Sequence, residues 1–334
     1  MAPLDLAQLP LGERVQHELL VLERAERSKS DGDPYVVLRL GNPSGSIETA
    51  PIWAEQLAWA DGAERGMIVQ AIGHVSVYGK NGHTKRQLTL TAPLRVLPAG
   101  QARAEEFLPR IAGDCTRLWD WVDRTRAEVR SGRLRRVLDL FFGDDDFRLR
   151  FERAPGSVAG HHAKLGGLLL HTYEVTSIAR AAARTTRVNR DLVVAGALLH
   201  DVGKVEAYEI GPAGFDHTPR GLLLGHVVLG CLMLQCRVAE AAGARGERVC
   251  SDGQLLELEH LILSHHGALE FGSPVQPMTV EAELVHWADE TSAKTHDMMD
   301  ALGDPEGFAA GGEFSDRKLW RVGRRVWRRP HSWE

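Results

Sequence analysis

A chain of 334 residues is long enough for two domains, and its 43% hydrophobic and 25% charged residues are typical of an ordinary globular protein. The formal net charge of −5 excludes a protein that is basic throughout, so any surface that binds nucleic acid must be local. We expect no membrane contact, because no apolar run approaches the roughly 18 residues of a membrane-spanning helix and no secretory signal is evident at the N-terminus.

Residues 12–98 have the pattern of a small β-barrel. Runs of β-forming residues are separated by turn-forming residues, and a short helical stretch lies between the third and fourth runs. Five strands with a helix at this point are typical of an OB-fold, which commonly binds single-stranded nucleic acid. The predicted strands are 15–22, 35–40, 47–53, 67–78 and 87–96, and the predicted helical stretch is 54–60.

The remainder of the chain predicts an all-α domain over residues 104–334, joined to the barrel by the Pro-Ala-Gly linker at 98–100. Apolar residues recur there at helical spacing, as in Leu165, Leu168 and Leu169. A small hairpin near 208–215 is the expected interruption. The fold class is therefore a multidomain α and β protein, with an OB-type barrel at 12–98 followed by a helical domain.

Four cysteines bear on the cellular compartment. They form no CxxC pair, and Cys231 and Cys236 lie in an apolar run with helical character. Buried free thiols of this kind are usual in a reducing environment. The cysteines therefore predict a cytoplasmic protein.

Histidine and aspartate residues recur on the apolar faces of successive predicted helices. His200 and Asp201 end one such helix, with Gly203 as its expected C-cap, and a buried imidazole and carboxylate need a metal or a charged partner. Each residue alone has an ordinary explanation as a core histidine, a first-turn histidine or a helix cap. Together they indicate one metal site, formed by His171, His200, Asp201, His226, His265, His266 and Asp289.

These ligand types suit a divalent transition metal. Imidazoles and carboxylates without thiolates fit manganese, iron, cobalt, nickel or zinc, and they disfavour a structural zinc site. Two ions roughly 3.5–4 Å apart would activate water and hold both oxygens of an in-line displacement at phosphorus. We expect one or two ions per chain, the first held by His171, His200, Asp201 and Asp289, and the second by His226, His265 and His266 with Asp201 as the bridge.

The same stretch offers cations for a phosphate. Lys204 follows the His-Asp pair and is placed to neutralise a phosphate oxygen, as are His161 and His162 farther upstream. A metal site with such neighbours predicts hydrolysis of a phosphate ester. Asp201 and Lys204 are the expected catalytic residues.

Further candidate contacts to nucleic acid combine aromatic and basic residues. Residues 317–329 interleave Arg, Lys and Trp, and this segment is either a solvated or packed tail or a strip that meets phosphates and bases. For Trp53, a place in the barrel core is as well supported by the sequence as a contact with nucleic acid. In the barrel the candidates are Tyr35, Trp53, Tyr78, Lys80, Lys85 and Arg86.

The order His, His-Asp, Asp resembles the HD superfamily of metal-dependent phosphohydrolases, and longer motifs resemble the YhaM-type 3′-to-5′ exoribonucleases over nearly the whole chain. The resemblance implies an OB-fold, a cytoplasmic location, manganese or cobalt, the metal positions named above, and removal of nucleotides from a 3′ end. One departure is Ser292, where relatives commonly carry a second acid. The motifs are HHAKLGGLLLH (161–171), HDVGK (200–204), GHVVLG (225–230), LILSHHGALEFGSP (261–274), EAELVHWADETSAK (281–294) and GEFS (312–315).

The leading hypothesis is a manganese-dependent 3′-to-5′ exonuclease that converts single-stranded RNA to nucleoside 5′-monophosphates. Single-stranded DNA is a second candidate substrate. Two alternatives stay open. The same metal site would serve a phosphohydrolase of small nucleotides, although the barrel and the basic tail count against this. The second alternative is a nucleic-acid-binding protein with a vestigial metal site, although the full set of ligands counts against it. The sequence also leaves a homo-oligomer open.

Overall fold

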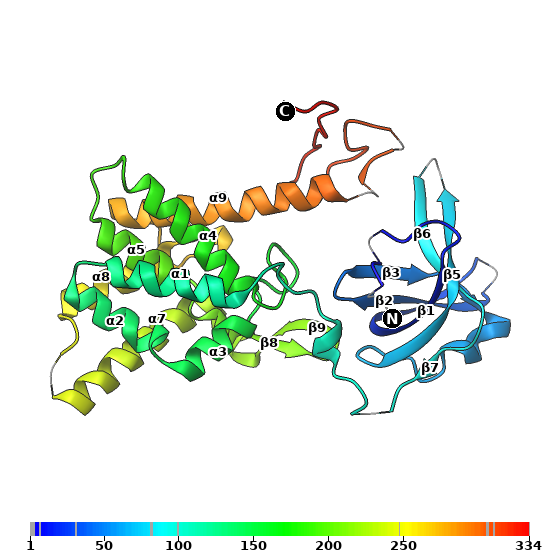
Figure 1. Ribbon diagram of the computed structural model, residues 1–334, viewed down its shortest axis with the longest axis horizontal. Helices are drawn as coiled ribbons and strands as arrows, with labels where there is room; N and C mark the ends of the chain where they lie inside the picture. The colour runs from blue at the N-terminus through cyan, green and yellow to red at the C-terminus, as the bar shows by residue number, and fades with distance from the viewer. Residues whose placement is uncertain are drawn as a thin grey trace. The chain divides into compact units, whose positions relative to one another are not determined.

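The chain, seen in a computed structural model, divides into two compact units (Figure 1). The first comprises Met1–Arg110, Ile210–Gly214 and Leu302–Glu334, and the second comprises Ile111–Glu209 and Phe215–Ala301. The sequence-based division had placed residues 210–214 and 302–334 with the helical domain. The structure describes residues 4–6, 8–30, 32–80, 83–98, 100–246, 248–304, 307–309 and 311–333.

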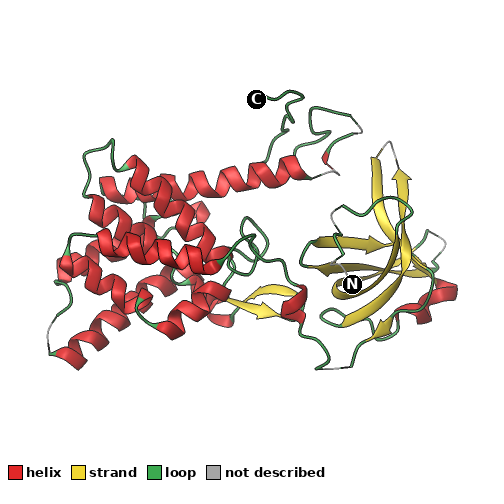
Figure 2. Ribbon diagram, viewed as in Figure 1, coloured by secondary structure: helices red, strands yellow, loops and turns green. Residues whose placement is uncertain are grey.

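The predicted barrel is confirmed in the first unit (Figure 2). Antiparallel pairing joins β1 to both β2 and β5, and β3 pairs in parallel with β6, so the sheet closes on itself. Alternate residues such as Val36, Leu38 and Leu40 point into its core. The elements are β1 (Arg14–Ser28), β2 (Pro34–Asn42), β3 (Gly45–Thr49), β4 (Ile52–Trp53), the 3-10 helix η1 (Ala54–Ala60), β5 (Ile68–Lys80), β6 (His83–Leu90), β7 (Arg95–Val96) and η2 (Ala104–Phe107).

The second unit is a helical bundle with a large apolar core. Side chains such as Phe141, Phe147 and Phe151 are fully buried there and pack ring against ring. The predicted hairpin near residue 208 is present as β8 and β9. The elements are α1 (Cys115–Glu128), α2 (Gly132–Phe142), α3 (Asp145–Arg153), α4 (Gly167–Ala182), α5 (Arg190–Leu199), α6 (Lys204–Ala207), β8 (Tyr208–Gly211), β9 (Gly214–His217), α7 (Pro219–Arg245), α8 (Asp252–Ser264), η3 (Leu269–Phe271) and α9 (Val280–Gly303).

Helix α7 corrects one expectation from the sequence. Among the described residues, its stretch Pro219–Ala244 is long and apolar enough to cross a membrane, by length and composition alone. A core helix of a globular protein can meet the same criterion, but only 33% of the most apolar window of α7 is buried: Leu229 and Leu234 are buried, whereas Leu223 is exposed. The helix also bends at Gly225, whose φ of 74° lies in the left-handed region that favours glycine. The residue after this bend is His226.

The C-terminal segment corrects a second expectation, because it does not continue as helix after α9. Antiparallel bridges join Phe314 to Trp327 and Leu319 to Arg324, which makes a small hairpin. Leu319 and Val326 are buried, whereas Trp320 is 76% exposed. The Leu319 carbonyl oxygen accepts hydrogen bonds from Val322 and Gly323, which form a single turn, and the Leu319–Arg324 bridge closes the hairpin directly after it.

Candidate metal centre

Helix α5 carries the His-Asp pair into the centre of the second unit. Its N-terminus is capped by the Asn189 side chain, which accepts a hydrogen bond from the backbone N–H of Leu192. Every residue from Leu192 to Leu199 is buried, so the helix runs through the core and ends inside it. The His200 and Asp201 side chains are themselves buried. Their desolvation must be offset by partners brought from other helices.

Gly203 closes this turn, although not as the expected left-handed C-cap. Its φ of −68° is ordinary right-handed backbone. The position needs glycine because α7 passes directly against it: a Cβ atom there would lie 2.0 Å from the carbonyl oxygen of His226 and 2.4 Å from the backbone nitrogen of Gly230. Close backbone contact therefore holds Asp201 and His226 in a fixed relation.

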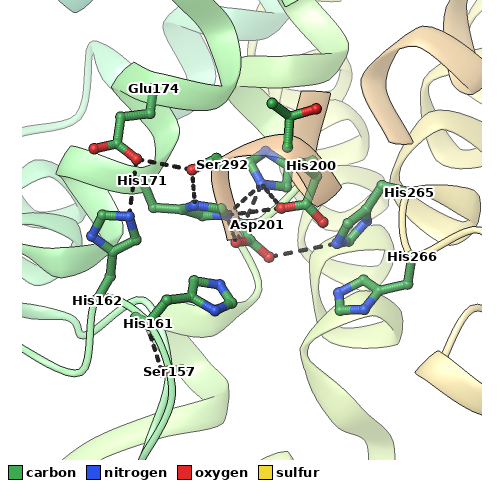
Figure 3. Close-up of polar contacts among 12 residues, drawn as sticks. Ser157, His161, His162, His171, Glu174, His200, Asp201, His265, His266 and Ser292 are labelled. Carbon is green, nitrogen blue, oxygen red and sulfur yellow. Dashed lines mark hydrogen bonds and ion pairs between the residues drawn. The ribbon is translucent and has the colours of Figure 1, made fainter. Parts of the chain in front are cut away.

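Asp201 lies between two groups of histidines (Figure 3). Its Oδ2 atom is 3.3 Å from Nε2 of His171 on α4 and 3.2 Å from Nε2 of His200. Its Oδ1 atom is 3.4 Å from Nε2 of His226 on α7 and 3.6 Å from Nε2 of His265 at the end of α8. One carboxylate thus faces both groups, as the bridging role predicted from the sequence requires.

The remaining predicted ligands complete the two groups. Oδ1 of Asp289, on α9, lies 3.0 Å from Nε2 of His171 and 3.9 Å from Nε2 of His200. Nε2 of His266 lies 3.1 Å from Nε2 of His226. The ligand atoms of each group lie within 4.8 Å of one another. The structure therefore brings all seven predicted residues together.

The orientation of the imidazoles fits a cation. Nδ1 of His200 donates to the carbonyl oxygen of Ala197, and Nδ1 of His265 donates to that of Ile262, both at 2.7 Å. In these tautomers each Nε2 presents a lone pair to the centre. Among the described residues, the buried Nε2 of His265 and Oδ1 of Asp201 have no hydrogen-bond partner. Converging lone pairs and unpartnered buried acceptors are what a divalent metal would satisfy.

The electrostatics of the centre favour a positive charge near Asp201. Burial opposes protonation of His171, but hydrogen bonds with Asp201 and Asp289 raise its pKa to about 8. Burial lowers the pKa of His226 to about 3 and holds the pKa of His265 well below its usual value. These two histidines are therefore neutral at physiological pH, which is the form that binds a metal.

Lys204, the first residue of α6, is buried beside Asp201. Its Nζ atom lies 2.5 Å from Oδ2 of Asp201. Burial lowers the pKa of Lys204, but the Asp201 charge outweighs it and raises the pKa above its usual value. The ammonium group is therefore charged and keeps Asp201 ionised. Its predicted contact with a substrate phosphate stays a prediction.

The two upstream histidines behave differently from each other. His161 lies beside the centre, with its ring centroid 5.6 Å from that of His171, and burial lowers its pKa to about 3. It would therefore meet a phosphate as a neutral hydrogen-bond partner. His162 adopts a left-handed φ of 57°, and its buried side chain forms a hydrogen bond with Glu174. This placement speaks against the predicted contact of His162 with nucleic acid.

Sequence reasoning missed two residues beside the centre, Glu174 on α4 and His296 on α9, and it noted Ser292 on α9 only as a departure from the relatives. The Glu174 carboxylate faces Ser292, His162 and His296 at 2.9–3.0 Å. Burial alone would raise the pKa of Glu174, but hydrogen bonds with the two histidines lower it to about 2. The available signal was the spacing of Glu174 three residues after His171, which places both on one helix face.

The aromatic candidates of the barrel lie on its surface. Trp53 is 38% exposed, so it is not the core residue of the alternative interpretation, and Nζ of Lys29 lies 4.6 Å from its ring. The Tyr35 ring is 5.2 Å from the Trp53 ring, across the β2–β4 pair. Tyr78 on β5 is exposed. These rings are accessible for stacking on bases.

The basic candidates of the barrel are partly engaged within it. Lys85 forms an ion pair with Glu48 at 2.7 Å. Arg86 donates to the carbonyl oxygen of Leu9. The Lys80 side chain falls outside the described residues. Lys85 and Arg86 therefore offer less free charge to a phosphate backbone than the sequence suggested.

Comparison with known proteins places this site in a family. Residues 168–294 match the HD domain. The chain is 31% identical over 297 residues to the 3′-5′ exoribonuclease YhaM of Bacillus subtilis, covering 87% of this chain and 88% of the relative. It is 32% identical to the protein of that name from Bacillus licheniformis, with 87% and 88% covered, and 30% identical to that from Listeria welshimeri, with 93% and 94% covered. No solved structure matches.

The similarity spans the barrel and the helical unit alike, and the HD match contains His171, the His200-Asp201 pair and Asp289. The region that matches the HD domain therefore contains the His-Asp pair around which the imidazole lone pairs converge. The chain belongs to the family of YhaM, the HD-domain 3′-5′ exoribonucleases.

Proposed function

We propose that this chain hydrolyses single-stranded RNA from the 3′ end and releases nucleoside 5′-monophosphates. The observation that carries the proposal is Asp201, which faces two groups of histidines with one carboxylate. Membership of the family supports the 3′-to-5′ direction of digestion and RNA as the substrate, since the relatives are named 3′-5′ exoribonucleases.

The chemistry needs the bond between phosphorus and the 3′ oxygen of the preceding nucleotide to break, while a water oxygen bonds to phosphorus. When bound, divalent cations stabilise charge on phosphate oxygens and lower the pKa of water. Asp201 and Asp289 would supply the anionic ligands of such a cation, and the surrounding histidines would supply the neutral ligands. Lys204 holds Asp201 in its ionised form. We propose that His161, whose ring lies beside that of His171, forms a hydrogen bond with the phosphate.

Manganese is the metal we propose first, with cobalt, iron and nickel as alternatives, and one or two ions per chain. Nitrogen and carboxylate ligands without thiolate suit all four of these metals, and the resemblance to the family is the reason for placing manganese first. We further propose a cytoplasmic location, which is consistent with the free cysteines of the described chain, although Cys236 is exposed and Cys231 is only partly buried, contrary to the expected burial of both. DNA as a second substrate and assembly into a homo-oligomer are extensions of the proposal.

Digestion of a 5′-labelled single strand tests this function. With manganese, we expect a ladder that shortens from the 3′ end, and chelation by EDTA should stop it because the ligands alone supply no Lewis acid. Fresh manganese should restore it. An intact strand together with rapid hydrolysis of a mononucleotide would support the small-substrate alternative. Full cleavage in the presence of EDTA would contradict the metal site.

The exposed barrel aromatics give a separate prediction. We expect Trp53→Ala to weaken binding of a single-stranded oligonucleotide about tenfold, because stacking contributes roughly 1–3 kcal/mol per base. Binding is measured by fluorescence anisotropy in EDTA, so that the strand stays intact. The control is Leu11→Ala, which removes another exposed apolar side chain of the first unit. Equal affinities for the two variants would remove Trp53 from the binding surface.

A further inference from the structure

A chain of hydrogen bonds leads from the metal centre to the Glu174 carboxylate (Figure 3). Nδ1 of His171 lies 3.3 Å from Oγ of Ser292, and Oγ of Ser292 donates to Oε2 of Glu174 at 2.9 Å. Because the serine hydroxyl donates to Glu174, its oxygen accepts a hydrogen bond from the Nδ1–H group of His171. Nε2 of His171 then faces Asp201 and Asp289, and once it has lost its proton its lone pair is available to a metal.

Two histidines hold Glu174 from its other sides. Nε2 of His162 lies 3.0 Å from Oε2 of Glu174, and Nε2 of His296 lies 2.9 Å from Oε1. Each of these nitrogens is a donor if Glu174 is ionised, so one carboxylate accepts three hydrogen bonds. The left-handed φ of His162 turns its side chain inward to make this contact.

We propose that Glu174, acting through Ser292, is the positioning residue for His171: it fixes the tautomer and ring orientation in which His171 binds the metal. This inference rests on the proposed function, because it assigns an outer partner to a ligand of the same site. Metal-binding histidines generally donate their second nitrogen to a carboxylate or a carbonyl. His200 and His265 use backbone carbonyls for this purpose, whereas His171 uses the serine and the carboxylate behind it.

Glu174, His162 and His296 together resemble a metal site, because their ligand atoms also lie within 4.8 Å of one another. The pairing of donors and acceptors favours the hydrogen-bonded role. Around Glu174 each histidine nitrogen faces a carboxylate oxygen. In the metal centre, histidine nitrogens face one another as well as carboxylate oxygens, as between Nε2 of His200 and Nε2 of His171 at 3.3 Å, and a metal would bind the lone pairs of both. A third ion at Glu174 is the alternative that the experiment must separate.

The test is the affinity of the metal-free protein for Mn²⁺, measured by calorimetry without RNA. We expect Glu174→Gln and Ser292→Ala each to weaken the binding of Mn²⁺ about tenfold or more, the range typical of outer partners of metal ligands. Glu257→Gln, at an exposed position of α8, is the matched control and should leave the affinity unchanged. Circular dichroism and thermal unfolding establish that each variant is folded.

A double-mutant cycle separates a chain of contacts from independent effects. If Glu174 acts through Ser292, adding Glu174→Gln to Ser292→Ala should cause little further loss of Mn²⁺ affinity. The double variant Glu174→Gln, Ser292→Asp should recover most of the affinity, because a carboxylate at position 292 would lie directly beside Nδ1 of His171.

Three results would overturn the inference. Unchanged Mn²⁺ affinity in folded Glu174→Gln would show that the carboxylate does not support His171. Loss of one whole equivalent of bound metal, with the other sites unaffected, would assign Glu174 to an ion of its own. A wild-type protein that binds no divalent metal would refute the proposed function as well, so the two failures are distinguishable.

Discussion

Asp201→Asn should lower the rate of RNA hydrolysis by about 10³-fold or more and reduce the metal content of the purified protein. The carboxylate faces both sets of histidines, so we expect its loss to weaken the binding of every ion in the centre. Removing several kcal/mol of charge stabilisation corresponds to this rate loss at about 1.4 kcal/mol per factor of ten. The measurements are turnover of a labelled strand and metal analysis.

The same substitution also removes the partner of buried Lys204, so stability must be measured in parallel. Asp252→Asn is the matched control, because Asp252 is an exposed residue at the start of α8 that forms an ion pair with Arg248. It should leave both turnover and metal content at the wild-type level. Asp201→Asn protein that is folded and still fully active would contradict the assignment of the centre.

Gly203→Ala should be strongly damaging although it adds only one methyl group. The added Cβ would lie 2.0 Å from the carbonyl oxygen of His226, and backbone atoms cannot move aside as a flexible side chain can. We expect the free energy of unfolding to fall by roughly 3 kcal/mol or more, the upper range for overpacking. Separation of α6 from α7 would also move His226 relative to Asp201, so metal affinity should fall.

Gly243→Ala provides the contrast for this prediction. Gly243 lies in α7, and no atom lies within 4 Å of a Cβ added there. Alanine should stabilise an exposed helix position by roughly 0.5–1 kcal/mol relative to glycine. Urea unfolding of both variants gives the comparison. A Gly203→Ala protein as stable as wild type would show that the packing of α6 against α7 is less tight than the structure indicates.

The barrel could be predicted from sequence because its strands bury alternate residues. The predicted strand 15–22 nevertheless stopped short of Ser28, where β1 ends. Residues 23–28 are polar and carry no apolar alternation, but they continue to pair with β2 as an extended hairpin. Pairing with a neighbouring strand is a long-range property that a local pattern does not record. The C-terminal hairpin escaped prediction for the same reason.

The metal ligands could be predicted because an ionisable residue on an apolar helix face needs an explanation. Glu174 gave only a weak signal: it shares a helix face with His171, but an acid on a helix is usually solvent-exposed. Its role depends on contacts from α9 and from the turn before α4, both distant in sequence. His162 was assigned to the substrate because its left-handed backbone, which turns the ring inward, cannot be read from a His-His pair.

A crystal structure of the manganese-loaded protein, with anomalous scattering from the metal, tests the central claim most directly. We predict anomalous peaks within bonding distance of the Asp201 carboxylate, beside His171 and Asp289 and beside His226 and His265. Manganese bound elsewhere, with the Asp201 carboxylate free of it, would contradict the account.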